Sequence, residues 1–285
     1  MKYPIRVLQV VTYMGRGGLE TMLMNYYRHI EHSKVQFDFL THREFEADYD
    51  KEILSLGGQI YHLSKLNPIS SSYKKELDEF FNSHKEYKVV HSHLDCMSGT
   101  PLKEARKCHV PYRIAHAHSS NQTKDMKYPL KLIFKRSITK NANYLFACGE
   151  QAGKWMFNTD NFKVLNNAID AKAYSFNSIS RGSIRKEFHI PNDSFVVGHV
   201  GRFMNPKNHT FIIDIFNQFH NDHPNSYLML VGEGELKTSI QDKVNTLGLE
   251  DYVIFTGLRS DVNELLQAMD VFLFPSLYEG LPVSI

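Results

Sequence analysis

Cysteine is scarce in this sequence. The 285 residues include three, Cys96, Cys108 and Cys148, and no Cys-x-x-Cys pair occurs among them. An odd number of widely spaced cysteines excludes a disulfide framework that would staple the fold. We therefore expect a protein of the reducing cytoplasm.

Long hydrophobic runs are also missing. Near the N-terminus the apolar run spans residues 5–11, where Arg6 and Gln9 interrupt it. That is too short for a signal-peptide core or a membrane span. No later stretch approaches the ~18 uninterrupted apolar residues of a spanning helix. We expect a soluble chain, which can still lie on a membrane surface.

Neither sign of charge predominates. The 33 Lys and Arg residues nearly balance the 31 Asp and Glu residues. The chain therefore lacks the strong positive field of a nucleic-acid-binding protein, and no nucleic-acid partner is expected. The charge is uneven, because residues 1–170 have a net charge of +6 and residues 171–285 one of −4. The first half is the expected contact for anionic partners.

Strand-like and helix-like segments alternate from the start, which is the pattern of a parallel sheet covered by helices on both faces. The expected strands are residues 5–11, 35–41, 59–63, 88–93, 112–118, 143–148 and 162–165. Helical stretches include residues 19–30, 72–87 and 126–140. The alternation predicts an α/β fold, with a Rossmann-like, doubly wound N-terminal domain over residues 1–170.

The alternation stops at residues 166–193, which gain Asn, Ser, Gly and Pro and predict a domain junction, with a linker over residues 171–193. It restarts in a second doubly wound domain, residues 194–285, with strands expected at 195–201, 227–231, 252–256 and 271–274. This domain is predicted to be incomplete, because the chain stops at Ile285 where another helix should begin. Two such domains facing each other place a ligand in the cleft between them.

The first candidate site is the glycine-rich loop after the first expected strand. Gly15, Gly17 and Gly18 let backbone amides and a helix N-terminus approach an anion. Glu20 stands where the dinucleotide fingerprint requires glycine, and the Lys-Ser/Thr of a P-loop is absent. Nicotinamide and P-loop sites are therefore excluded, and the alternative is a tight turn without a ligand.

Two pairs of histidines form the second candidate site. His91 and His93 end one expected strand, and His116 and His118 end another. The spacing of two points both imidazoles of a pair to the same face. We favour a role in contacting a polar ligand or in acid–base chemistry. A metal site that includes Asp95, and plain packing, are the alternatives.

The third candidate site follows the strands of the second domain. Arg202, Lys207 and a helix N-terminus are expected to converge on one spot, which suits a diphosphate. Gly232 can bring the backbone close to the same ligand. Glu279, followed by Gly280, can accept hydrogen bonds from ligand hydroxyls. The alternative is a surface arginine and lysine without a ligand.

Taken together and in this order, these segments resemble the family 4 glycosyltransferases, which have the two-domain GT-B fold. The resemblance spans nearly the whole chain. It includes the Gly-Gly-Leu-Glu loop, His93, His118, the segment 166–170, the Gly-Arg and Lys of the second domain, Gly-Glu-Gly at 232–234 and the Phe-Pro-Ser-Leu-Tyr-Glu-Gly segment. Its N-terminal half is most similar to enzymes that make bacterial exopolysaccharide or capsule.

The resemblance implies a retaining transfer of a sugar from a nucleotide-diphosphate donor, in particular a UDP-sugar. The N-terminal domain would bind a saccharide acceptor, expected to be lipid-linked. The implied donor-binding residues are Gly17, Gly18, Arg202, Lys207, Gly232, Glu279 and Gly280. The implied catalytic residues are His118, beside the reacting sugar, and Glu279, with His93 and His116 near the sugar or acceptor. A second glutamate of the family motif would lie two residues beyond Ile285, which again predicts a C-terminally truncated chain.

Fixed positive groups that stabilise the departing diphosphate are the main catalytic resource of such a reaction. We therefore expect no metal and no other cofactor. A sugar-nucleotide 2-epimerase of similar fold, and a metal-dependent hydrolase using His91, His93, His116 and His118, are the alternative functions.

A basic segment precedes residue 140. Lys127, Lys131 and Lys135 recur every four positions beside Leu130 and Phe134. This pattern predicts an amphipathic helix on an anionic lipid surface, and a helix packed on the sheet is the alternative. We expect a cytoplasmic protein that is peripheral at the inner face of the plasma membrane.

Overall fold

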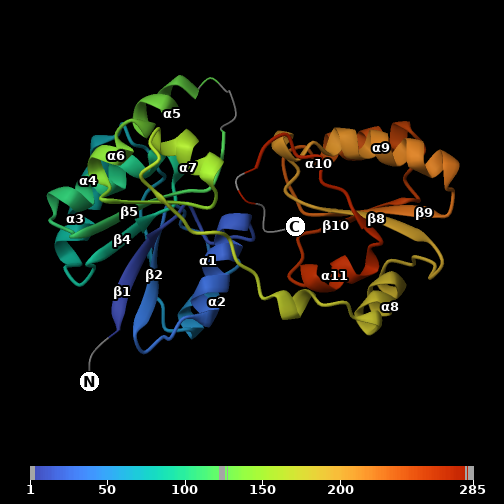
Figure 1. Cartoon of the computed structure of the whole chain (residues 1–285), viewed down its shortest axis with the longest axis horizontal. Helices are drawn as coiled ribbons and strands as arrows, with labels where there is room; N and C mark the ends of the chain where they lie inside the picture. Colours follow the sequence, from blue (N-terminus) through green and yellow to red (C-terminus); the bar gives the residue numbers. More distant parts are fainter. Residues whose placement is uncertain (1–3, 122–125, 127, 280, 282–285) are drawn as a thin grey trace. The chain divides into compact units, whose positions relative to one another are not determined.

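The computed structural model of the chain describes residues 4–121, 126, 128–279 and 281. They form two compact α/β units (Figure 1). The first unit contains residues up to 169 together with residues 279 and 281, and the second contains residues 170–278. Each unit has its own parallel sheet with helices on both faces, which confirms the predicted fold class.

The parallel sheet of the first unit has the strand order β3-β2-β1-β4-β5-β6-β7. Its strands are β1 (Ile5–Val10), β2 (Val35–Thr41), β3 (Ile60–His62), β4 (Val89–Ser92), β5 (Tyr112–Ala117), β6 (Tyr144–Ala147) and β7 (Lys163–Val164). The order reverses between β1 and β4, since β2 and β3 lie on one side of β1 and the later strands on the other. Such a switch point leaves room for a ligand at the carboxyl ends of the two strands.

Two apolar layers cover this sheet, because successive side chains of a strand point to opposite faces. In β2, Phe39 belongs to one layer and Leu40 to the other. Helices α1 (Gly18–His29) and α2 (Asp50–Ser55) pack on the Phe39 face. The opposite face is covered by α3 (Ser71–Ser83), α4 (Gly99–Lys107), α6 (Ile138–Asn141) and α7 (Glu150–Phe157).

The parallel sheet of the second unit has the order β10-β9-β8-β11, with β8 (Phe195–Val200), β9 (Ser226–Val231), β10 (Val253–Gly257) and β11 (Val271–Phe272). Its switch point lies between β8 and β11. One face carries α9 (His209–Asp222) and α10 (Lys237–Thr246). The other carries α8 (Ser178–Glu187) and α11 (Val262–Ala268).

The stretch expected as a linker, residues 171–193, differs from that expectation. It contains a short 3-10 helix, η2 (Ala171–Tyr174), and α8, and it belongs to the second unit. The reason is the side chain of Arg185 in α8, which is 1% exposed. It donates hydrogen bonds to the carbonyl oxygens of Ala268 and Ser194 and to the carboxylate of Asp270. A buried guanidinium that joins α8 to α11 and to the start of β8 makes this stretch part of the domain.

The helix expected over residues 126–140 is also different. The structure has α5 (Tyr128–Lys135) and α6, separated at residues 136–137. At the break, Ser137 donates both its amide and its hydroxyl to the carbonyl oxygen of Phe134, at 2.9 and 2.7 Å. Among the described residues, no helix has the length and hydrophobicity needed to cross a membrane.

Candidate active site

The glycine loop lies at the carboxyl end of β1, where the strand order reverses. Gly17 caps α1 with an extended backbone, and its carbonyl oxygen accepts from the amide of Thr21 at 2.9 Å. Arg16, Gly17 and Gly18 are exposed. A Cβ on Gly17 would lie 2.3 Å from a carboxylate oxygen of Glu20, so a side chain at this position would have to displace the flexible end of Glu20. The structure thus leaves a helix N-terminus open to an anion.

A polar cluster lies at the carboxyl ends of β1, β4 and β5, next to this loop in the sheet order. We call it the histidine cluster; its members are Gln9, His91, His93, His116 and His118. The register of β1 and β4 pairs Gln9 with His91, and the register of β4 and β5 places His116 two residues beyond the partner of His91. All five side chains therefore lie on one face of the sheet.

Hydrogen bonds join the cluster across the strands. His91 Nε2 lies 3.2 Å from His116 Nδ1, and His93 Nδ1 lies 2.8 Å from His118 Nε2. His93 Nε2 lies 2.8 Å from Oε1 of Gln9. Within each sequence pair the rings are close, with centroids 4.1 Å apart for His91 and His93 and 4.2 Å for His116 and His118. The prediction that each pair shares one face is confirmed.

The imidazoles of the cluster are neutral at pH 7. Burial lowers the pKa of His116 to about 3. Burial, followed by the neighbouring imidazoles, lowers the pKa of His91, His93 and His118 well below the ordinary value of 6.5. Desolvation disfavours the charged form of each ring. The cluster therefore offers hydrogen-bond donors and acceptors without a positive charge.

Three of these histidines are of the right type and close enough together to bind one metal ion. Ligand nitrogens of His91, His93 and His116 lie within 4.8 Å of one another, and Nε2 of His116 is buried without a hydrogen-bond partner among the described residues. Neutral imidazoles are ordinary zinc ligands. Both nitrogens of His93, however, are engaged by Gln9 and His118, so a metal at His93 would replace one of these bonds. The geometry fits a hydrogen-bonding surface better than a metal centre.

The second unit presents cations at the carboxyl end of β8. Arg202 is exposed, and its side chain has no ion pair or hydrogen bond with any residue that the structure describes. Lys207 ends the 3-10 helix η3 (Asn205–Lys207), and its Nζ lies 5.4 Å from the ring centroid of Phe274. Asn208, with φ +56°, then turns the chain into α9. This part of the second unit combines an available guanidinium with a helix N-terminus.

Glycines join the loops that follow β8 and β9. Gly232 has φ +138°, and a Cβ there would lie 2.4 Å from the carbonyl oxygen of Gly201. A Cβ on Gly201 would itself lie 2.8 Å from Nε2 of His199. The amide of Phe203 donates to the carbonyl oxygen of Glu233 at 3.0 Å. The two loops therefore pack backbone against backbone and form one surface at the β8–β9 end of the sheet.

Comparison with known proteins identifies the family. The family model "Glycosyl transferases group 1" matches residues 180–285. The putative glycosyltransferase EpsF of Bacillus subtilis is 36% identical over 289 aligned positions, which cover 98% of this chain and 75% of EpsF. The chain belongs to the group 1 glycosyltransferases. It is also 25% identical to the capsular polysaccharide biosynthesis glycosyltransferase CapH of Staphylococcus aureus, over 98% of this chain and 77% of CapH.

A solved structure shows the same fold. HepE of Anabaena, crystallised with UDP and glucose, superposes with a TM-score of 0.78 at 17% identity, over 95% of this chain and 74% of HepE. The resemblance to family 4 and the GT-B fold is thereby confirmed, and this protein is a glycosyltransferase of the bacterial polysaccharide type.

The segment after β11 returns to the first unit of this glycosyltransferase. Glu279 belongs to that unit, and its carbonyl oxygen accepts a hydrogen bond from the hydroxyl of Ser120, two residues after His118. Asn167 donates to the carbonyl oxygen of Leu281 in the same unit. The backbone of Glu279 is thus joined to the segment that follows His118. Gly280, expected to bind the donor, lies outside the described residues.

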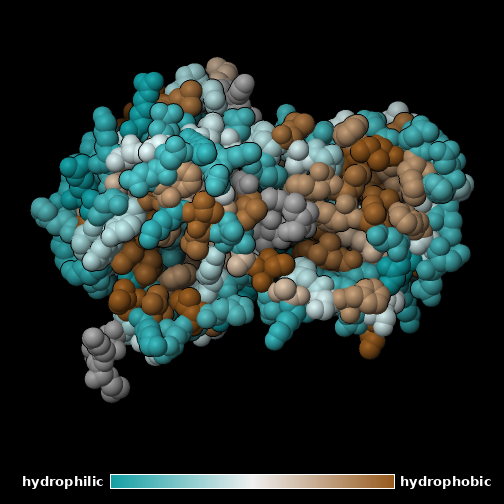
Figure 2. All heavy atoms as spheres, in the orientation of Figure 1, coloured by the Kyte–Doolittle hydropathy of each residue, from teal (hydrophilic) through white to brown (hydrophobic). Residues whose placement is uncertain are grey.

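The lysines expected to contact a membrane do not form one exposed basic face of a helix. Lys135 is directed toward α7: its Nζ lies 4.3 Å from the ring centroid of Trp155 and donates to the carbonyl oxygen of that residue. Burial lowers the pKa of Lys135. Lys131 is half-buried, whereas Ile133 is 61% exposed. Figure 2 shows hydrophobic side chains at the surface over α5. Lys127 lies outside the described residues.

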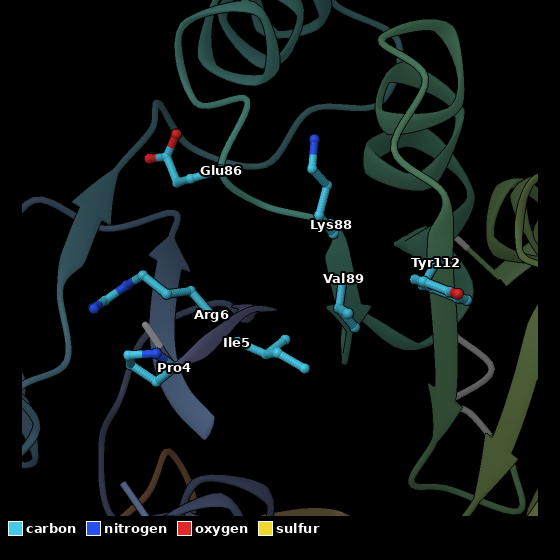
Figure 3. Close-up of a pocket in the computed structure, with 7 residues that line it drawn as sticks. All are labelled: Pro4, Ile5, Arg6, Glu86, Lys88, Val89 and Tyr112. Atoms are coloured by element: carbon cyan, nitrogen blue, oxygen red, sulfur yellow. The ribbon is translucent and has the colours of Figure 1, made fainter. Parts of the chain in front are cut away.

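A separate hollow of about 570 Å³ opens at the opposite end of the first sheet (Figure 3). It is lined by Pro4, Ile5, Arg6, Glu86, Lys88, Val89 and Tyr112. The lining residues come from the amino ends of β1, β4 and β5. Arg6 is paired with the buried Asp38 at 2.5 Å. No residue of the histidine cluster lines this hollow.

Two residues near these sites were not expected from the sequence. Gln9 completes the histidine cluster. In the sequence, the only feature that marks Gln9 is that it is a polar residue within an apolar strand. His209, 1% exposed, stacks on Phe203 at 4.1 Å between ring centroids, beneath the Arg202 loop. Burial lowers the pKa of His209 to about 3. In the sequence, the feature that marks His209 is its position in the first turn of an apolar helix.

Proposed function

We propose that this chain transfers a sugar from a UDP-sugar donor to a saccharide acceptor in the assembly of a bacterial polysaccharide. The observation that carries the proposal is the exposed guanidinium of Arg202, available beside glycine backbone at the switch point of the second sheet. A diphosphate satisfies such a group with charge-assisted hydrogen bonds. The likeness to HepE, crystallised with UDP and glucose, supports uridine diphosphate as the leaving group.

In the proposed reaction, the bond between the anomeric carbon and the diphosphate oxygen breaks while the acceptor oxygen bonds to the same carbon. Arg202 and Lys207 stabilise the charge that develops on the leaving diphosphate, and the amides near Gly232 add fixed dipoles. The acceptor hydroxyl attacks from the face that the diphosphate leaves, and its proton passes to a phosphate oxygen. Anomeric configuration is therefore retained. Retention in the NMR spectrum of the product supports this step, and inversion contradicts it.

The sugar is proposed to lie against His118 and Glu279. A neutral imidazole can exchange hydrogen bonds with sugar hydroxyls without attracting the diphosphate, and a carboxylate accepts from hydroxyls. His93 and His116 support the same surface. The scheme relies on side-chain cations and backbone dipoles to stabilise the developing charge, and it requires no metal.

The test is calorimetric titration of the chain with UDP, with and without EDTA. We expect binding that EDTA leaves unchanged, and that Arg202→Ala weakens by about tenfold to a hundredfold, the loss of one or two charge-assisted hydrogen bonds. Lys186→Ala, which removes an exposed cation from α8 of the same unit, is the control and should bind UDP like the parent chain. Absence of UDP binding, or equal effects of both variants, contradicts the proposal. Consumption of a UDP-sugar without transfer to any acceptor would indicate the alternative function, a sugar-nucleotide 2-epimerase.

The acceptor is proposed to be lipid-linked, which places the enzyme in the cytoplasm at the inner face of the plasma membrane. The exposed side chains of Met126 and Ile133, at 100% and 61%, would enter the interface while Lys131 contacts anionic headgroups. We expect binding to phosphatidylglycerol liposomes that weakens with salt. Ile133→Asp should reduce it, whereas Ile69→Asp, a change at another exposed isoleucine of the same unit, should not. Equal binding of both variants would exclude α5 as the contact.

A further inference from the structure

The histidine cluster contains a continuous hydrogen-bonded chain of three side chains. It runs from Gln9 in β1, through His93 after β4, to His118 after β5. The two links are 2.8 Å each, from Oε1 of Gln9 to Nε2 of His93 and from Nδ1 of His93 to Nε2 of His118. Gln9 and His93 are 1% and 4% exposed, whereas His118 is only half-buried. The chain thus begins inside the sheet and ends at a partly accessible ring.

The first link determines the tautomer of every later member. The oxygen of Gln9 accepts, so the proton of neutral His93 is on Nε2. Nδ1 of His93 then has a lone pair, and it can accept only from an N–H on Nε2 of His118. With one proton on a neutral ring, Nδ1 of His118 is left as an acceptor. Burial keeps both rings neutral by lowering the pKa of each.

The other pair of histidines limits rotation of these rings. His91 packs on His93, and His116 packs on His118, at ring-centroid distances of 4.1 and 4.2 Å. His91 and His116 also contact each other through Nε2 and Nδ1 at 3.2 Å. Because close packing resists rotation, the ring of His118 is held in one orientation.

We propose that Gln9 and His93 are positioning residues that hold His118 with its proton on Nε2 and its lone pair on Nδ1, so that Nδ1 accepts a hydrogen bond from a hydroxyl group of the sugar being transferred. The inference rests on the proposed glycosyl transfer, which supplies the sugar. It assigns the direction of the hydrogen bond: the sugar donates and the protein accepts. A sugar that lacks the hydroxyl in question loses that bond.

The direct test is the tautomer of His118 in the full chain labelled with 15N-histidine, read from long-range 1H–15N spectra and assigned with His118→Gln. We expect a protonated Nε2 and a bare Nδ1 in the parent chain. Gln9→Leu removes the acceptor and should give a mixture of tautomers. Gln9→Glu retains an acceptor oxygen and, at a pH where His93 remains neutral, should show the parent spectrum. His29→Gln, which removes an exposed histidine of α1 outside the cluster, is the control and should leave the His118 tautomer unchanged.

A parent chain with the proton on Nδ1 of His118 would overturn the inference, because the chain would then run in the opposite direction. So would a Gln9→Leu spectrum identical to that of the parent. The parent and Gln9→Glu spectra decide the question even where Gln9→Leu fails to fold.

Kinetics separate this inference from the proposed function. Gln9→Leu should lower kcat by about tenfold, the value of one hydrogen bond, with less than a twofold change in UDP affinity. Gln9→Glu should recover most of the rate. If the parent chain neither binds UDP nor transfers sugar, the proposed function fails while the tautomer measurement still stands. If the parent transfers sugar and Gln9→Leu retains both its rate and its tautomer, this inference alone fails.

Discussion

Acid should destabilise the first unit before the second, because the first unit contains the histidine cluster. A buried neutral histidine has a lower pKa in the folded chain than in the unfolded chain. Between these two values the unfolded chain binds the proton and the folded chain does not, so the free energy of unfolding falls as the pH decreases. The full contribution is present above about pH 6.5 and is lost progressively toward the folded-state pKa.

The magnitude follows from His116, whose pKa is about 3. Lowering the pH from 7 to 5 should remove about 2 kcal/mol of stability through this ring alone. His91, His93 and His118 act in the same direction, since burial lowers each pKa. In the second unit His209, with a pKa of about 3, also costs about 2 kcal/mol over this range. Because the free energy of unfolding of a whole domain is about 5–15 kcal/mol, these losses are a large part of it, and the first unit should lose more stability than the second by pH 5.

The sole tryptophan of the sequence makes this measurable. Trp155 lies in α7 of the first unit, so its fluorescence in urea reports the unfolding of that unit. We expect the free energy of unfolding to fall steeply from pH 7 to pH 5. The fall should be smaller by about 2 kcal/mol in His116→Gln. His109→Gln, which removes an exposed histidine from the same unit, should retain the parent slope. Equal stability at both pH values, or an unchanged slope in His116→Gln, would refute the reasoning.

Two substitutions test the packing of the second unit. Measured by thermal melts, Gly232→Ala should lower the free energy of unfolding by about 2–3 kcal/mol, because φ is +138° and the new Cβ would meet the carbonyl oxygen of Gly201. Gly248 also has a positive φ, but a Cβ there would meet nothing within 4 Å, so Gly248→Ala should cost only about 1 kcal/mol. In urea denaturation, Arg185→Met should lower the free energy of unfolding by about 3–5 kcal/mol, because the carbonyl oxygens of Ala268 and Ser194 lose their hydrogen-bond donor. A decrease below about 1 kcal/mol would contradict the structural role given to Arg185.

The sequence was sufficient to predict that the two histidine pairs lie on one face of the sheet, because strand geometry determines the direction of their side chains. A spacing of two in a strand and the parallel register of β4 and β5 bring both pairs to one face without further information. Gln9 shows where this reasoning stops. It and Arg6 were visible as polar interruptions of an apolar strand, but their partners, His93 and Asp38, are far away in sequence. A single polar residue in a strand predicts a buried partner without saying which.

The basic segment shows a second limit. Spacing alone predicted a row of lysines on one side of a helix, but what a helix packs against decides which side is outside. Lys135 contacts Trp155 of α7, and the exposed position belongs to Ile133. The expected linker differs for a similar reason. The same stretch contains Arg185, and two of the partners of Arg185, Ala268 and Asp270, lie over 80 residues later in α11 and just after it.

Net charge and the available guanidinium indicate different halves of the chain as the contact for an anion. The first half of the chain has the positive balance, yet the available guanidinium of Arg202 lies in the half with the negative balance. A diphosphate is held by donors within a few ångströms, and surface charges beyond the Debye length of about 10 Å are screened. Both sheets place their switch point beside the first strand of the unit. Neutral imidazoles lie at the carboxyl ends of the next strands, β4 and β5, in the first unit, whereas cations follow β8 itself in the second. Such a division suits a reaction in which the sugar needs hydrogen bonds and the leaving group needs charge, and the side chains at these two strand ends carry more functional information than the composition of either half.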